Sequence, residues 1–289
     1  MAPGRISNPG LGWFNKQSCD QLQQQLQSDG VSSAIETLTG HVWDLSRHPL
    51  GCRLIQLAIE RGSQKEAKAL ANELRGHVVE AMTSPHANYV LQKIVTQLIW
   101  QTCGFVASEL QDSASHLGRH RFGCRIFCRL IEFHAEQEAT QALVEEVLLE
   151  AEDLCCHPFG HHVAQSILEH GCEKHRDAVA STIEINPLGF ARNQNASYLV
   201  ERVLTSCSDA HQQLLLSELS SSLVDLAVSR FGCYVARAVV EHPKSKKSSE
   251  IGKLLAVQGE LNKTKHGQYL LADLGLSRKP NSRKATRQM

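Results

Sequence analysis

The sequence of 289 residues has no excess of either charge, because 30 Lys and Arg balance 30 Asp and Glu. Proteins that hold polyanions mainly by charge carry a strong basic excess, so this class is excluded. A protein that reads nucleobases by stacking and edge contacts is still allowed. No run of 18 apolar residues occurs, so no membrane-spanning segment is expected. The 42% hydrophobic content is enough to build a buried core.

Ten cysteines are present, but none of their spacings forms the CxxC pair of a zinc ribbon or finger. The initial MAPGR lacks the apolar run of a signal peptide. We therefore expect thiols in a reducing compartment, with no structural metal and no cofactor. GxSxG, P-loop and HExxH motifs are also missing, and the 15 histidines recur along the chain instead of converging. An enzyme is not expected.

A short motif recurs seven times, each time after a small residue. The segments read HPLGCRLIQ, SPHANYVLQ, HRFGCRIFC, HPFGHHVAQ, NQNASYLVE, SRFGCYVAR and TKHGQYLLA. The small residues are Gly51, Ala87, Gly123, Gly160, Ala196, Gly232 and Gly267. Their spacings of 36, 36, 37, 36, 36 and 35 residues indicate a repeat protein.

Apolar residues follow each small residue at distances of three, four and seven, which is one stripe of an α-helix. In the first repeat these residues are Leu54, Ile55 and Ala58. Three residues before the small residue lie His48, Ser84, His120, His157, Asn193, Ser229 and Thr264, and the four Ser, Thr and Asn residues among them are predicted helix N-caps.

Each motif helix is flanked by two further helical segments. Short apolar segments such as residues 41–45 and 77–81 precede it, and helical stretches such as residues 63–74, 136–149 and 209–219 follow it. Because one such unit cannot bury its own stripe, neighbouring units must stack. The predicted fold is an all-α, right-handed α-solenoid (crescent) of about seven three-helix repeats over residues 31–276. Residues 1–30 are predicted as a Gln-rich, partly disordered segment or a fraying helix, and residues 277–289 as a basic disordered tail.

We number the motif positions from the residue that follows the small residue. Position two holds a planar group in every repeat: Arg53, Tyr89, Arg125, His162, Tyr198, Tyr234 and Tyr269. All four tyrosines of the chain fall at this position. The alternative is that position two only packs between repeats. Such a site would also accept flat side chains, but we would then expect aliphatic residues as well, and the two arginines would be harder to explain. We therefore predict that position two stacks on the bases of single-stranded RNA.

Positions one and five are four residues apart, so we expect them side by side on the helix face opposite the stripe. The pairs are Cys52/Gln56, Asn88/Gln92, Cys124/Cys128, His161/Gln165, Ser197/Glu201, Cys233/Arg237 and Gln268/Ala272. These residues vary while the apolar scaffold does not, and most carry a hydrogen-bond donor or acceptor. We predict that they contact base edges, with Ala272 unable to contribute a polar group.

The motifs resemble those of the Pumilio (PUF) family of RNA-binding proteins, over about residues 31–276. The resemblance implies one base per repeat on a concave face, with the RNA antiparallel to the protein. It implies that Ser197/Glu201 reads guanine, Asn88/Gln92 reads uracil and Cys52/Gln56 reads adenine, which gives the register 5′-N-N-G-N-N-U-A-3′. The first six motifs look like the third to eighth of the family. Cys128 and Arg237 depart from its pattern, since glutamine is expected at both positions.

The resemblance also implies a role in mRNA repression or decay, with an mRNA 3′ untranslated region as ligand. Repressor or deadenylase proteins on the convex face would be its partners. We expect a monomer without membrane contact, located in the cytoplasm, with a nuclear or nucleolar location as the alternative. A protein-interaction α-solenoid and an rRNA-processing relative with degenerate recognition are the alternative functions. The zero net charge and the irregular position-one and position-five pairs of repeats three, six and seven favour the protein-interaction solenoid among these alternatives.

Overall fold

The computed structural model describes residues 12–277, and this part of the chain contains helices and no strand. Each repeat consists of a short first helix, a motif helix and an outer helix. The first helices are α3 (Val42–Arg47), α6 (Val78–Thr83), α10 (Ala114–Gly118), α13 (Ala151–Cys156), α16 (Pro187–Arg192), α19 (Leu223–Ala227) and α22 (Gln258–Leu261). The motif helices are α4 (Gly51–Arg61), α7 (Ala87–Gln97), α11 (Gly123–His134), α14 (Gly160–His170), α17 (Ser197–Ser206), α20 (Gly232–Glu241) and α23 (Lys265–Asp273).

The outer helices follow the motif helices in six repeats. They are α5 (Gln64–Asn72), α8 (Trp100–Cys103) with α9 (Phe105–Ser108), α12 (Glu138–Leu148), α15 (Glu173–Ile185), α18 (Asp209–Ser221) and α21 (Lys247–Ala256). In repeat two the outer helix is interrupted at Gly104, which separates α8 from α9. The predicted three-helix unit is therefore confirmed in repeats one to six. The seventh repeat comprises α22 and α23 within the described residues.

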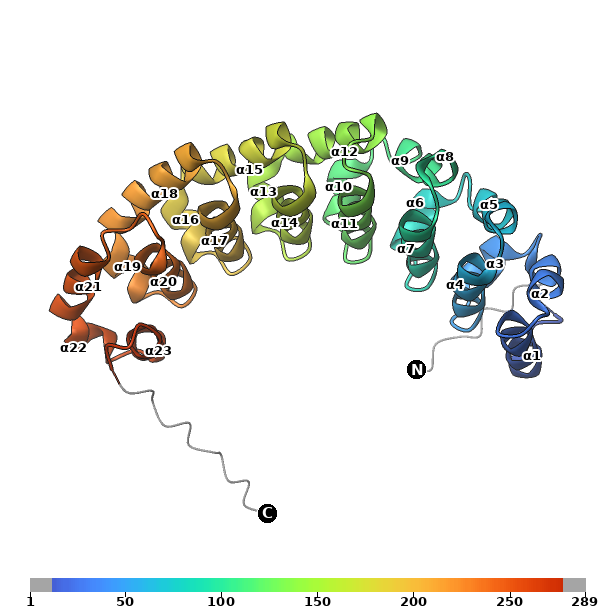
Figure 1. The fold of residues 1–289 in the computed structure, drawn as a ribbon, viewed down its shortest axis with the longest axis horizontal. Coiled ribbons are helices and arrows are strands. Elements are labelled where there is room, and N and C mark those ends of the chain that lie inside the picture. Colours follow the sequence, from blue (N-terminus) through green and yellow to red (C-terminus); the bar gives the residue numbers. More distant parts are fainter. Residues whose placement is uncertain (1–11, 278–289) are drawn as a thin grey trace, which may run out of the picture. The chain divides into compact units, whose positions relative to one another are not determined.

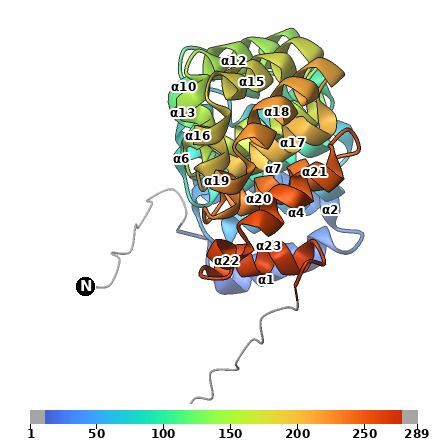
Figure 2. The same ribbon diagram turned by 90° about the vertical axis from the view of Figure 1, so that its left-hand side faces the viewer.

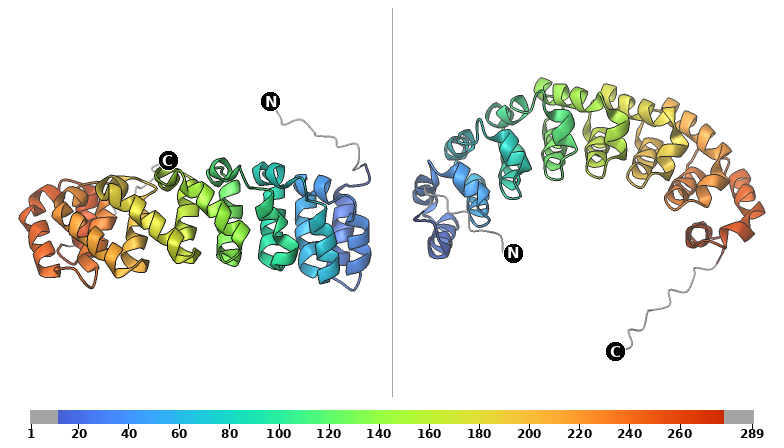
Figure 3. Two further views of the ribbon diagram at one scale, coloured as in Figure 1. Left: turned by 90° about the horizontal axis from the view of Figure 1, so that it is seen from above. Right: turned by 180° about the vertical axis from the view of Figure 1, so that it is seen from behind.

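The chain divides into two compact units, one of residues 1–150 with 170–172 and the other of residues 151–169 with 173–289. In unit 1 the motif helices α4, α7 and α11 form one row and the outer helices form a second (Figure 1). In unit 2, the first helices α16 and α19 pack against the motif helices α17 and α20, and α19 also packs against the outer helix α21 (Figure 2). Figure 3 shows the rows of each unit from above and from behind.

The core of each repeat is the predicted stripe. Positions three and four of the motif are buried in all seven repeats, and position seven is buried in the first six. The small residue that precedes the stripe lies against the end of the short first helix. A Cβ on Gly123 would lie 2.3 Å from the carbonyl oxygen of Leu117, and one on Gly267 would lie 2.3 Å from that of Leu261. This close approach fixes the motif helix against the first helix of its own repeat.

A side-chain acceptor three residues before the small residue holds this junction. The residues predicted as N-caps, Ser84, Asn193, Ser229 and Thr264, each accept the small residue's backbone N–H at 2.9–3.1 Å. Only Thr264 is the N-cap of its motif helix, whereas Ser84 and Asn193 follow the last residue of the preceding first helix. The three histidines at the same position, which sequence reasoning did not predict as caps, accept the equivalent N–H through Nδ1 at 3.2–3.3 Å. Neutral imidazole has one acceptor nitrogen, so the same backbone group is satisfied in all seven repeats.

In unit 1, carboxylates at the end of the outer helix bond to the start of the first helix of the same repeat. Glu73, just after α5, accepts the backbone N–H groups of Gly40 and Val42 at the start of α3. Glu109 and Glu146 make the equivalent contacts one and two repeats later, with Gly76 and with Asp112 and Ala114. These bonds satisfy backbone donors at the start of the first helices.

The helical array begins before residue 31. Residues 16–26 form α1 (Lys16–Leu26), whose first turn is closed by a capping box between Asn15 and Ser18, and α2 (Val31–Leu38) follows. Buried Cys19, Leu22 and Leu26 share one face of α1, while the glutamines occupy the other. The Gln-rich composition hides this three- and four-residue spacing, which is why the sequence leaves the segment undecided between disorder and helix. Residues 1–11 and 278–289, which include nearly all of the predicted basic tail, lie outside the described residues.

Between residues 12 and 277, no helix is long and apolar enough to cross a membrane. In the same part of the chain, no group of three or more His, Cys, Asp or Glu side chains is placed to hold a metal ion.

Candidate nucleic-acid interface

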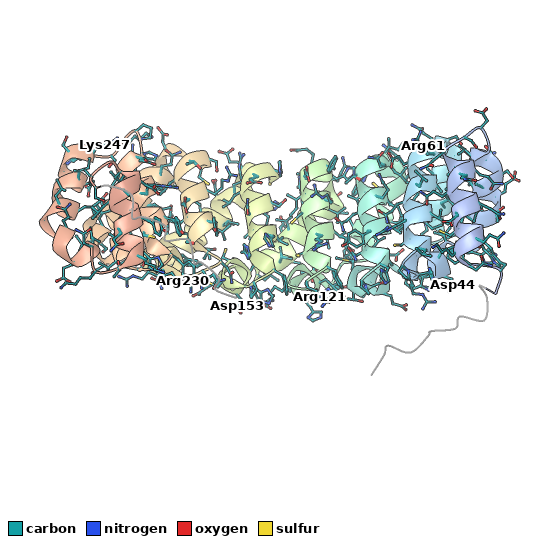
Figure 4. The ribbon with its side chains drawn as sticks, turned by 90° about the horizontal axis from the view of Figure 1, so that it is seen from below. Asp44, Arg61, Arg121, Asp153, Arg230 and Lys247 are labelled. Atoms are coloured by element: carbon teal, nitrogen blue, oxygen red, sulfur yellow. The ribbon has the colours of Figure 1, made fainter. Side chains whose placement is uncertain are left out.

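The planar residues of position two are exposed in all seven repeats. The four tyrosines expose between 42% and 62% of their surface, although a tyrosine that only packed between repeats would be buried. Figure 4 shows the motif helices of each unit from below the view of Figure 1. In unit 1, Asp44 and Arg121 mark the edge at which these helices begin and Arg61 marks the edge at which they end. We call this side of each unit the motif face.

Planar groups of neighbouring repeats lie close to one another on the motif face of unit 1. The Arg125 guanidinium carbon lies 6.0 Å from the centre of the Tyr89 ring, and its Nη1 donates a hydrogen bond to the Tyr89 hydroxyl at 3.3 Å. A base inserted between two planar groups requires about 7 Å, which is two contact distances of about 3.5 Å. A small outward movement of Arg125 would therefore admit a base.

A cavity of about 310 Å³ lies between α4 and α7 and has the form of a base slot. Arg53 and Tyr89, the position-two residues of repeats one and two, line it together with Cys52 and Gln56, the predicted edge pair of repeat one. Pro49 and His86 complete the lining. Its volume is at the lower end of the range of about 300–1,000 Å³ for small-ligand pockets. The geometry thus brings together the residues that the sequence assigns to one base.

A second cavity of about 260 Å³ continues along the motif face. It shares Gln56 and Tyr89 with the first and adds Gln92, which is position five of repeat two. Lys93 and Arg129, both at position six, line it as well. Sequence reasoning missed these two cations, although a basic residue at position six of repeats two, three and five is visible in the sequence. Lys93 Nζ lies 2.8 Å from Glu60 Oε2, at position nine of the preceding repeat.

Position one is mostly buried, which corrects the expectation that it lies on the face opposite the stripe. Five of its seven residues are buried: Cys52, Asn88, Cys124, Ser197 and Cys233. Each cysteine donates its S–H to the carbonyl three residues earlier, and Asn88 Nδ2 donates to the Ser84 carbonyl at 2.7 Å. The physical reason is that position one adjoins the small residue, where the motif helix lies closest to the first helix. Gln268 and His161 are only half-buried.

Position five is half-exposed in every repeat and carries the accessible edge. Gln92 donates through Nε2 to Asn88 Oδ1 at 3.0 Å, which leaves its Oε1 as an outward acceptor. Gln56 donates to the Cys52 carbonyl at 2.8 Å, and Gln165 donates to Glu169. Position one thus supports position five from beneath in repeats one and two. Cys128 and Ala272 offer no comparable group at their positions.

Repeat five places the carboxylate of Glu201 at position five. Burial raises the pKa of Glu201 above its ordinary value of 4.5, and the nearby Arg237 cation partly offsets this effect. Arg237, position five of repeat six, lies 3.6 Å from Asp273 and 3.9 Å from Glu241. A half-buried carboxylate accepts hydrogen bonds strongly, and the guanine edge offers donors at both N1 and N2.

The buried thiols of Cys103 and Cys155 do not have the properties of nucleophiles. Burial raises the pKa of Cys103 to about 11 and that of Cys155 to about 12, so both are protonated at neutral pH. Cys103 Sγ lies 3.4 Å from Nε2 of His134, but the same nitrogen lies 2.9 Å from the Val95 carbonyl. This histidine nitrogen therefore donates to the backbone and is not an available base.

A profile of the Pumilio-family RNA binding repeat matches residues 41–75, 77–97, 114–148, 151–183, 188–220 and 222–242. The chain belongs to the Pumilio family. The six matched segments coincide with repeats one to six, and the seventh motif helix, α23, follows them in the structure. The α-solenoid fold predicted from the 36-residue period is confirmed.

Named relatives and solved structures agree with this assignment. A Pumilio domain-containing protein of Schizosaccharomyces pombe is 24% identical over 241 residues, which cover 82% of this chain and 35% of the relative. The putative pumilio homolog 7 of Arabidopsis thaliana is 22% identical, with 76% of this chain and 40% of the relative covered. The chain thus spans about a third to two fifths of the length of these relatives.

Two solved Pumilio structures have the same fold. The structure of PUF-8 in complex with PBE-RNA has a TM-score of 0.80 at 18% identity and covers 88% of this chain and 78% of its own. The Puf4 RNA binding domain bound to an HO endonuclease RNA 3′ UTR sequence has a TM-score of 0.78 at 20% identity, with coverages of 93% and 87%.

Proposed function

We propose that this Pumilio-family chain binds single-stranded RNA on the motif faces of its repeats, without performing chemistry on it. The observation that carries the proposal is the slot between α4 and α7, where Arg53 and Tyr89 flank the edge pair of repeat one. The exposure of all seven position-two residues supports the same mode in the other repeats. Base stacking on aromatic and guanidinium planes is how proteins hold unpaired RNA.

The proposed register follows the family rule, with the RNA antiparallel to the protein. Repeat five takes guanine through Glu201, repeat two takes uracil through Gln92, and repeat one takes adenine through Gln56. Position one acts mainly as a buried support for these contacts. Repeats three, four, six and seven contribute stacking, and their base preferences are left open. The zero net charge of the chain is consistent with recognition by stacking and edges more than by phosphate attraction.

We further propose a role in the control of mRNA translation or decay, through a sequence in a 3′ untranslated region. The solved relative Puf4 is bound to such a sequence. Repressor or deadenylase proteins would bind the outer helices, and the chain would act as a cytoplasmic monomer.

The decisive experiment measures the affinity of a seven-nucleotide RNA with G third, U sixth and A seventh, and of its variants with another base at the third position. Glu201→Ala should remove the preference for guanine, which we expect to be worth about 1–3 kcal/mol. The other positions should keep their preferences. Glu218→Ala removes an exposed carboxylate from outer helix α18 of the same unit and is the matched control. An equal loss of affinity for all four bases would contradict the register. No binding at low salt, where phosphate contacts are strongest, would instead support a protein-binding solenoid.

A further inference from the structure

A third cavity, of about 400 Å³, lies between α1 and α4 in unit 1. Asp20 and Gln23 of α1 and the C-cap Gln27 line it on one side, and Arg53 and Gln56 of α4 line it on the other. Helix α1 lies outside the segments that match the Pumilio repeat, the first of which begins at residue 41. The wall that it contributes therefore belongs to no assigned base site.

This cavity repeats, 36 residues earlier, the lining of the second cavity of the motif face: Gln56, Tyr89 and Gln92 there correspond to Asp20, Arg53 and Gln56 here. Helix α1 packs against α4 as α4 packs against α7. Asp20 stands 36 residues before Gln56, so it occupies the place of position five on α1. Arg53 and Gln56 line both cavities. The guanidinium of Arg53 thus separates two adjoining spaces, and a base in each would stack on one of its two faces.

The polar groups of the α1 wall favour a particular kind of base. Asp20 can only accept hydrogen bonds in its ionised form, whereas the amides of Gln23 and Gln27 can donate and accept. Adenine, cytosine and guanine each carry an exocyclic amino group that can donate to a carboxylate. Uracil has no amino group, and its one edge donor, N3–H, lies between two carbonyl oxygens that repel the carboxylate, so uracil is the weaker partner. Glu60 also lines the cavity, but its carboxylate is paired with Lys93.

We propose that the cavity between α1 and α4 binds one additional ribonucleotide, whose base carries an amino group, directly 3′ of the base at repeat one. This inference rests on the proposed RNA binding and on the antiparallel direction of the RNA. Helix α1 then acts as a recognition element and not only as a cap on the end of the array.

The test compares the seven-nucleotide RNA defined above with versions extended by one cytidine or one uridine at the 3′ end. Stacking on Arg53 is open to either base, but only the cytidine amino group donates to the Asp20 carboxylate, so the 3′ cytidine should tighten binding at least about fivefold more than the 3′ uridine. Asp20→Ala should reduce the gain from the cytidine to that from the uridine and leave the affinity for the seven-nucleotide RNA unchanged. Asp29→Ala, in the exposed turn after α1, is the matched control. A cytidine added at the 5′ end should give no gain that depends on Asp20.

Different results separate the two proposals. If the seven-nucleotide RNA binds but the 3′ cytidine adds nothing, the α1 site is refuted while RNA binding stands. Equal gains from cytidine and uridine that survive Asp20→Ala would also refute it, because phosphate attraction alone would explain them. If no RNA binds at low salt, the proposed function itself fails.

Discussion

Replacing Tyr89 by alanine tests the stacking mode most directly, because this ring lines two neighbouring cavities of the motif face. Stacking of one base on an aromatic side chain contributes about 1–3 kcal/mol. In the unbound protein the ring already contacts Arg125, and separating an exposed cation from a ring costs about 0.5–1 kcal/mol. If one base stacks on each face of the ring at the lower value of about 1 kcal/mol, stacking contributes about 2 kcal/mol. Subtracting the cost of separating Arg125 from the ring leaves about 1–1.5 kcal/mol. Tyr89→Ala should therefore weaken RNA binding by at least about five- to tenfold.

The assay is fluorescence anisotropy with an end-labelled RNA at one fixed salt concentration, with circular dichroism to confirm that the helices are intact. Tyr89→Phe is the matched control, since it keeps the ring and removes only the hydroxyl that Arg125 contacts at 3.3 Å. It should bind within about threefold of the unsubstituted protein, because one exposed neutral hydrogen bond contributes about 1 kcal/mol or less. If Tyr89→Ala binds within twofold, or if the phenylalanine variant loses as much as the alanine variant, stacking at position two is wrong.

Two further predictions concern stability. Gly123→Ala should lower the free energy of unfolding, measured by urea titration, by about 1–2 kcal/mol, because its Cβ would lie 2.3 Å from the Leu117 carbonyl oxygen. Gly252→Ala, whose Cβ would meet nothing within 4 Å, should instead raise it by about 0.5–1 kcal/mol. Equal effects would contradict the close approach at Gly123. Burial holds the pKa of His48, near His86, and of His120, near His116 and Arg121, below the ordinary 6.5. Their contribution to stability is therefore complete above pH 6.5 and lost as the pH falls through the window below it. The double substitution His48→Ser and His120→Ser, which keeps an acceptor, should reduce the fall in melting temperature on acidification, and an unchanged fall would show that these caps do not titrate.

Much of the fold could be predicted from the sequence because its information is periodic. The stripe after each small residue and the planar group at position two recur seven times, so each repeat supports the interpretation of the others. Helix α1 shows the limit of this reasoning. It lacks the motif, and its apolar face of Cys19, Leu22 and Leu26 is short enough to be obscured by the glutamines around it.

The finer geometry of the site depends on contacts between elements, which a linear pattern does not contain. The burial of position one follows from how closely Gly51 and its equivalents approach the first helix. The capping role of His48 depends on which ring nitrogen faces the backbone. The contribution of Lys93 and Arg129 appears only when α7 and α11 are placed side by side, because both then line one cavity.

The unequal exposure of positions one and five has a consequence for how the recognised sequence can change during evolution. A substitution at half-exposed position five alters the edge offered to a base and disturbs few packed atoms. A substitution at position one must also refill a buried space and replace a hydrogen bond to the preceding turn. New preferences should therefore arise first at position five and be refined later at position one.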